Sequence, residues 1–93
     1  MAITEIKFEV RIRRRDRPGS VKAYADLTFF LPDGELEIMG FGVIQQPGQK
    51  PFVGFPQIRG TNKYFPVVEA KRETRERIVK AILQSFREAE ARD

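Results

Sequence analysis

Few side chains in this chain can perform acid–base or nucleophilic chemistry. The 93 residues include no His and no Cys, which removes the imidazole base, the thiolate nucleophile and the usual zinc ligands. Asp33, Glu35 and Glu37 alternate beside a turn, and their carboxylates could face a hard cation together. A solvated turn with charged edge residues is the simpler interpretation of these three. We therefore expect a protein without enzymatic activity, metal or cofactor.

Arginine is the residue type whose spacing is informative. Five arginines fall within seven positions: Arg11, Arg13, Arg14, Arg15 and Arg17. Guanidinium groups make bidentate hydrogen bonds to phosphate, so the cluster predicts contacts to a nucleic-acid backbone. A solvated hairpin that uses charge to discourage edge pairing is an equally good interpretation. The cluster alone does not decide between the two.

A second basic group lies further along the chain, with aromatic residues close to it in sequence. Its members are Lys50, Arg59 and Lys63, and the neighbouring rings are Phe52, Phe55, Tyr64 and Phe65. Exposed rings of this kind stack on unpaired bases. Such rings are more often part of a core, and alternation along a strand prevents Phe52 and Phe55 from both facing solvent in the same way.

A third basic group, Lys71, Arg72 and Arg75, falls near the start of an expected helix. Cations are unfavourable there because they meet the positive end of the helix dipole. Their position suggests a use other than stability, although Glu69, Glu73 and Glu76 partly neutralise them.

The elements that position these residues follow from hydrophobic periodicity. Alternating apolar and polar residues predict strands over residues 4–14, 21–31, from 36 to about 43, 52–55 and 64–68. In the first strand the alternation leaves Arg11 and Arg13 on the solvated face. Residues 57–63 read as a polar loop. From about residue 71 the period becomes helical, with Ile78, Ile82 and Phe86 on one stripe.

The third strand carries a break in its alternation. Leu36 and Ile38 belong to one parity, whereas Phe41 and Val43 belong to the other. We expect a bulge or sharp bend around Gly40, with the first pair facing one side of the sheet and the second pair facing the other.

Length and composition limit the remaining possibilities. The chain is long enough for one domain, residues 1–93, and its 41% hydrophobic content with eight Phe supports a real core. A net charge of +4 favours anionic partners. The absence of Cys, of a signal segment and of any apolar run near ~20 residues predicts a cytoplasmic protein with no membrane partner. Because small domains with free strand edges gain stability by pairing, we also expect a homodimer.

Read in order, these segments resemble the SpoVG family of small septation regulators. The stretches that carry the resemblance are Ile3-Thr4-Glu5-Ile6-Lys7-Phe8, Val21-Lys22-Ala23, Phe52-Val53-Gly54-Phe55-Pro56, Tyr64-Phe65-Pro66-Val67-Val68 and the helix from Arg75 to Leu83. The resemblance implies a mainly β homodimer that binds DNA, and in some members RNA, to regulate expression. It also implies a Lys-Arg pair after the proline-ended strand as a binding element. Ile58 and Arg59 occupy those positions, so only the arginine is kept.

The sequence therefore predicts an α+β domain with an antiparallel sheet of about five strands and a C-terminal amphipathic helix. We expect it to be a dimeric nucleic-acid-binding regulator of septation, sporulation or gene expression, with no small-molecule substrate. The residues expected to contact nucleic acid are Arg59, Lys63, Arg13, Arg14, Arg15, Arg17 and Lys50. The alternative is a protein-interaction module that uses an edge strand or a helix face.

Overall fold

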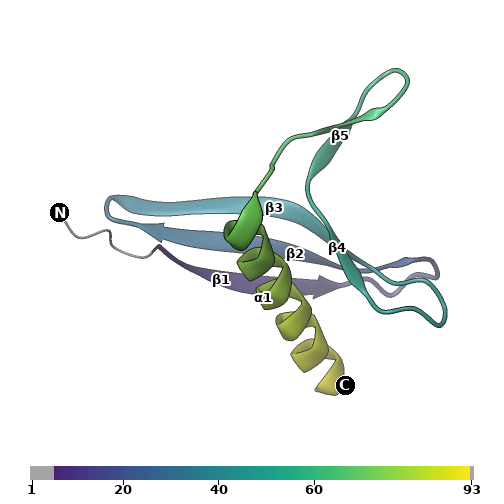
Figure 1. Ribbon diagram of the computed structural model, residues 1–93. Helices are drawn as coiled ribbons and strands as arrows, with labels where there is room; N and C mark the ends of the chain where they lie inside the picture. Colours follow the sequence, from purple (N-terminus) through teal and green to yellow (C-terminus); the bar gives the residue numbers. More distant parts are fainter. Residues whose placement is uncertain (1–5, 93) are drawn as a thin grey trace.

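The computed structural model describes residues 6–92 and shows one four-stranded antiparallel sheet, one helix and a separate two-stranded hairpin (Figure 1). The sheet contains β1 (Lys7–Arg14), β2 (Val21–Leu31), β3 (Gly34–Ile44) and β4 (Phe52–Gly54), which are neighbours in that order. The hairpin contains β5 (Gln57–Arg59) and β6 (Tyr64–Pro66), and the chain ends with α1 (Arg72–Ala91). The predicted α+β class is confirmed.

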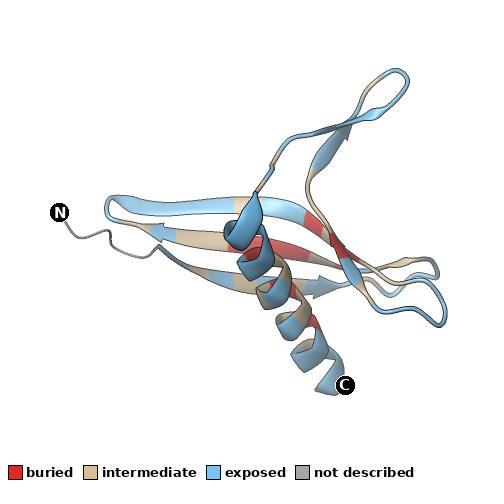
Figure 2. Ribbon diagram, viewed as in Figure 1, coloured by how far each residue is buried: buried red, intermediate tan, exposed pale blue. Residues whose placement is uncertain are grey.

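The core lies where α1 crosses one face of the sheet (Figure 2). The helix contributes its predicted apolar stripe, since Ile78, Ile82 and Phe86 are its buried residues. The sheet contributes Ala23, Ala25, Leu27, Phe41, Val43 and Val53, which are all buried. Within the described residues, no helix covers the opposite face of the sheet (Figure 1). The exposed residues on that face can therefore contact other molecules.

The predicted break in β3 is a β-bulge, but its consequence differs from the expectation. Ala25 is paired with Phe41 and Leu27 with Ile38, so β3 has one extra residue relative to β2 over this interval. Gly40, with a φ of 95°, supplies the left-handed backbone that the extra residue needs. Because paired residues share a face of the sheet, Ile38 and Phe41 both lie on the helix side. The prediction that they face opposite sides was wrong: the extra residue restores the parity.

Two further expectations are corrected by the hairpin. Gln57–Arg59 were expected in a loop, yet they form β5. β6 pairs with β5 rather than with the main sheet, so the strands divide into a group of four and a group of two. The first strand is described from Lys7, and its predicted start at residues 4 and 5 lies outside the described residues.

The start of α1 is poorly optimised for a helix. Lys71 occupies the N-cap position without a side-chain hydrogen bond, and Arg72 has a φ of 55°, which is left-handed for a residue with a Cβ. Among residues 6–92 no helix has the length and apolar character that a membrane crossing requires.

Candidate nucleic-acid interface

The β5–β6 hairpin, which we call the arm, projects from the body of the molecule (Figure 1). Its two ends meet at Pro56, whose carbonyl accepts a hydrogen bond of 3.0 Å from the N–H of Val67. Its turn is closed by the N–H of Gly60, which donates to the carbonyl of Lys63 at 2.7 Å. All six residues in its strands are exposed. The arm is therefore exposed to solvent, and its strand residues do not belong to the main core.

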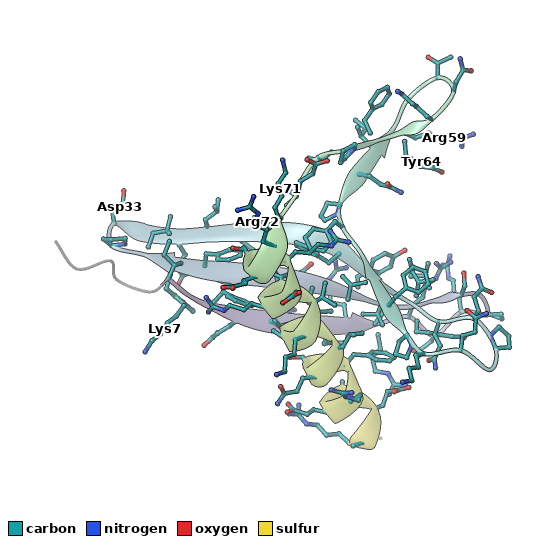
Figure 3. The ribbon with its side chains drawn as sticks, in the orientation of Figure 1. Lys7, Asp33, Arg59, Tyr64, Lys71 and Arg72 are labelled. Atoms are coloured by element: carbon teal, nitrogen blue, oxygen red, sulfur yellow. The ribbon has the colours of Figure 1, made fainter. Side chains whose placement is uncertain are left out.

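One face of the arm places a cation beside an aromatic ring. Arg59 is directly opposite Tyr64 in the β5–β6 register, so both side chains leave the same face. Tyr64 is 57% exposed, and Arg59 is exposed as well. Figure 3 shows both side chains on the arm, well away from the helix. A guanidinium and a free phenol ring side by side can bind a phosphate and stack on a base.

The other face of the arm is apolar and holds Lys63. Ile58 lies opposite Phe65 in the register, and both are exposed. The Nζ atom of Lys63 lies 5.0 Å from the centre of the Phe65 ring, a favourable cation–π distance. The ring packs so closely on Gly60 that a Cβ at that position would overlap it. Phe65 therefore fixes the shape of the arm, and Tyr64 is the more available ring.

A second group of cations gathers at one end of the sheet. Arg15 and Arg17 lie in the turn after β1, and Lys50 lies in the loop between β3 and β4. The two segments are joined by the N–H of Gln45, which donates to the carbonyl of Ser20 at 2.8 Å. Arg17 and Lys50 are exposed, whereas Arg15 is half-buried. Within one subunit this sheet end and the arm extend in different directions (Figure 1).

The remaining predicted arginines of β1 lie on opposite faces. Arg14 is paired with Ala23, which places it on the helix side of the sheet, and Arg13 is paired with Tyr24 on the open side. Arg13 is also engaged: its Nε and Nη2 atoms donate to the two carboxylate oxygens of Asp26 at 2.8 and 2.9 Å. Asp26 is only 4% exposed. Arg13 thus compensates a buried charge, so its main role is to stabilise the fold.

The aromatic residues near the helix start divide between core and surface. The ring of Phe55 packs edge-on against Phe41 at 5.0 Å, and the guanidinium of Arg75 lies 4.4 Å from its centre. Phe55 therefore belongs to the core, and the guanidinium of Arg75 lies over its ring. Phe52 remains 51% exposed at the edge of the sheet. No group of three potential metal-binding side chains occurs among residues 6–92.

The pairing of Arg59 with Tyr64 is the feature that sequence reasoning missed. Both residues were visible as members of a basic and aromatic group, but residues 57–59 were interpreted as a loop. Only the strand register shows that these two side chains share a face. A three-residue strand outside the core has no periodicity that could have revealed it.

Together these features define a class of protein: a small basic α+β domain with one helix on one face of an antiparallel sheet and a cationic, aromatic hairpin that projects from it. No family model matches the chain, and no solved structure matches it significantly. The chain is 38% identical over 85 residues to the "Putative septation protein SpoVG" of Archaeoglobus fulgidus. The alignment covers 88% of this chain and 94% of the relative. The chain therefore belongs to the SpoVG family, as its sequence pattern predicted.

Proposed function

We propose that this protein is a non-enzymatic regulator that binds DNA or RNA as a homodimer in the cytoplasm. The observation that carries the proposal is the exposed pair of Arg59 and Tyr64 on the projecting arm. The name of the archaeal relative supports a role connected with septation. The chain's net charge of +4 adds a general attraction to polyanions.

In the proposed binding mode the arm and the sheet end contribute different interactions. Arg59 contacts a phosphate and Tyr64 stacks on a base beside it, so the arm favours an unpaired or locally opened strand. Lys63 contributes charge from the other face of the arm. Arg17 and Lys50 at the sheet end supply further phosphate contacts, and Arg13 acts through the structure of the sheet.

Dimerisation is supported by the amount of apolar surface that one subunit leaves exposed. The large apolar residues with substantial exposure are Ile6, Phe30, Leu36, Met39, Phe52, Ile58, Tyr64, Phe65 and Val67. A two-stranded hairpin is also marginally stable in water unless something packs against it. A second copy that covers part of the arm would satisfy both needs and would double the number of phosphate contacts.

The proposal is tested by titrating single- and double-stranded oligonucleotides at several salt concentrations. Each phosphate contact contributes a log–log slope of about −0.9 on duplex DNA or about −0.7 on single strands. Arg59→Ala should reduce the slope by about one contact per subunit, which is about two contacts for the proposed dimer. Tyr64→Leu should leave the slope unchanged and weaken single-strand binding by about 1–3 kcal/mol, the value of one stacked base.

Two control variants separate the arm's geometry from its charge. Gly60→Ala keeps the net charge but displaces the Phe65 ring, so it should weaken binding if the shape of the arm matters. Lys7→Ala removes an exposed cation at the start of β1, away from the arm and from the cations at the other end of the sheet (Figure 3), and should have little effect. If the wild type shows no salt-sensitive binding to any oligonucleotide at low ionic strength, the proposal fails.

A further inference from the structure

A groove runs between the free edge of the sheet and the helix, on the side away from β1. It has a volume of about 870 Å³, and Val53 of β4 and Val79 and Leu83 of α1 contribute apolar side chains to its walls. A second hollow of about 420 Å³ shares Leu83 and Arg87 with it and continues toward Pro51. The two hollows are neighbours along the helix, and their apolar lining includes Val53, Val79, Leu83 and Pro51.

The sheet side of this groove is an unpaired strand edge. β4 is the last strand of the four-stranded order, and among residues 6–92 no strand lies beyond it. Such an edge presents N–H and C=O groups that can pair with another extended chain. Pro51 and Pro56 stand close to its two ends, which restricts pairing to a few residues and discourages open-ended aggregation.

The rim of the groove is predominantly cationic. The charged residues that line the two hollows are Lys50, Arg72, Arg75, Lys80 and Arg87 against Glu76 and Glu90. Five cations therefore face two carboxylates. The occupant that complements this rim is anionic at its sides and apolar where it meets Val53 and Leu83.

We propose that this groove binds an extended acidic segment of a partner protein, which adds a short strand to β4. Alternation along such a strand places its apolar side chains on the floor and its carboxylates on the rim. A nucleic acid would satisfy the cations but would leave the backbone groups of β4 unused. The proposal does not depend on oligonucleotide binding by the arm, because Arg59 and Tyr64 do not line the groove; Lys50, at one end of the groove, is the residue shared with the proposed phosphate contacts.

The test is fluorescence anisotropy of the full chain with a labelled seven-residue peptide that alternates Glu and Val. The same peptide with N-methylated central amides, and a peptide that alternates Lys and Val, serve as ligand controls. The Glu peptide should bind, and N-methylation should weaken it about tenfold, the equivalent of one or two lost hydrogen bonds. The Lys peptide should bind more weakly still.

Two double variants of equal net charge localise the site. Arg72→Glu with Arg87→Glu reverses the rim and should weaken the Glu peptide by about tenfold or more. Lys22→Glu with Arg59→Glu changes the net charge equally but leaves the groove intact, so peptide binding should persist even where oligonucleotide binding is lost. Circular dichroism confirms that both variants are folded.

Three results would overturn the proposal. Equal binding of the N-methylated peptide would exclude strand addition. Displacement of the peptide by an oligonucleotide would assign the groove to nucleic acid. Failure of the peptide to bind the wild type, together with loss of self-association in the Arg72→Glu and Arg87→Glu variant, would assign the groove to a second copy of the chain.

Discussion

Asp26 is a buried carboxylate on the sheet face that the helix leaves open, and its surroundings explain why it is tolerated. Burying a charge is costly unless it is paired and hydrogen-bonded. Arg13 donates two hydrogen bonds to it, and the backbone of Gly40 in the bulge adds a smaller favourable electrostatic interaction. The hydrogen bonds from Arg13 are the main reason that the pKa of Asp26 is lowered, with the Gly40 backbone as a smaller contribution. One side chain thus ties β1, β2 and β3 together.

The lowered pKa of Asp26 predicts a specific loss of stability in acid. In the unfolded chain an Asp titrates near ~3.9, so below that value the unfolded state binds a proton that the folded state does not. The stabilisation is complete above the unfolded pKa and is lost as pH falls through the lower folded pKa. Urea unfolding of the wild type from about pH 5 to about pH 2 should therefore show this loss.

Asp26→Asn provides the matched control for this titration because it keeps the shape and removes the charge. The variant should be less stable than the wild type at neutral pH, and the difference between the two should shrink in acid. A difference that stays constant from neutral to acid pH would show that Asp26 does not make the ion pair with Arg13 in solution.

Arg13 shows which properties of a single residue could be predicted from the sequence. The alternation of β1 correctly places it on the face without the helix, and it is exposed. Its partner could not be predicted, because Asp26 is thirteen positions away and meets it only through the strand register. An arginine on the solvated face and an arginine that neutralises a buried acid have the same sequence pattern. The prediction of phosphate contacts at Arg13 must therefore allow for its structural role.

At the scale of the elements, the bulge in β3 makes Gly40 a position where a side chain should be costly. Gly40→Ala should lower the free energy of unfolding by about 1–2 kcal/mol, because an L-residue at a φ of 95° is strained. Gly42→Ala is the control: that residue has no positive φ, and an added Cβ would meet only Ile44 at 3.9 Å. Its effect should stay within about 0.5 kcal/mol. Equal effects in chemical denaturation would contradict the assignment of strain to Gly40.

Long elements that bury one face could be predicted from the sequence. The range of β2 and the apolar stripe of α1 agree with the prediction, because burial of one face imposes its period on the sequence. The arm was divided incorrectly between loop and sheet because it buries no face. The bulge was predicted from the change in parity, but its effect on the two faces required the pairing with β2.

At the scale of the whole molecule, self-association should be measurable directly. The subunit mass is 10.8 kDa, and sedimentation equilibrium at micromolar concentration should report about twice that value. The apolar exposure of the arm and of the β2–β3 hairpin around Leu36 favours this outcome. A single species with the subunit mass would remove dimerisation from the proposed function while leaving the arm's contacts to be tested separately.

The closure of the arm at Pro56 has a consequence for how such proteins diversify. The segment leaves the core after Phe55 and returns beside its own starting point, where Val67 bonds to Pro56. Lengthening a closed excursion of this kind costs little, about 0.6 kcal/mol for each doubling of its length. Substitutions at the tip of the arm should therefore leave the sheet and helix undisturbed, because no arm residue belongs to the core. If the arm binds nucleic acid as proposed, recognition and folding can change independently, because the arm contributes no residue to the core.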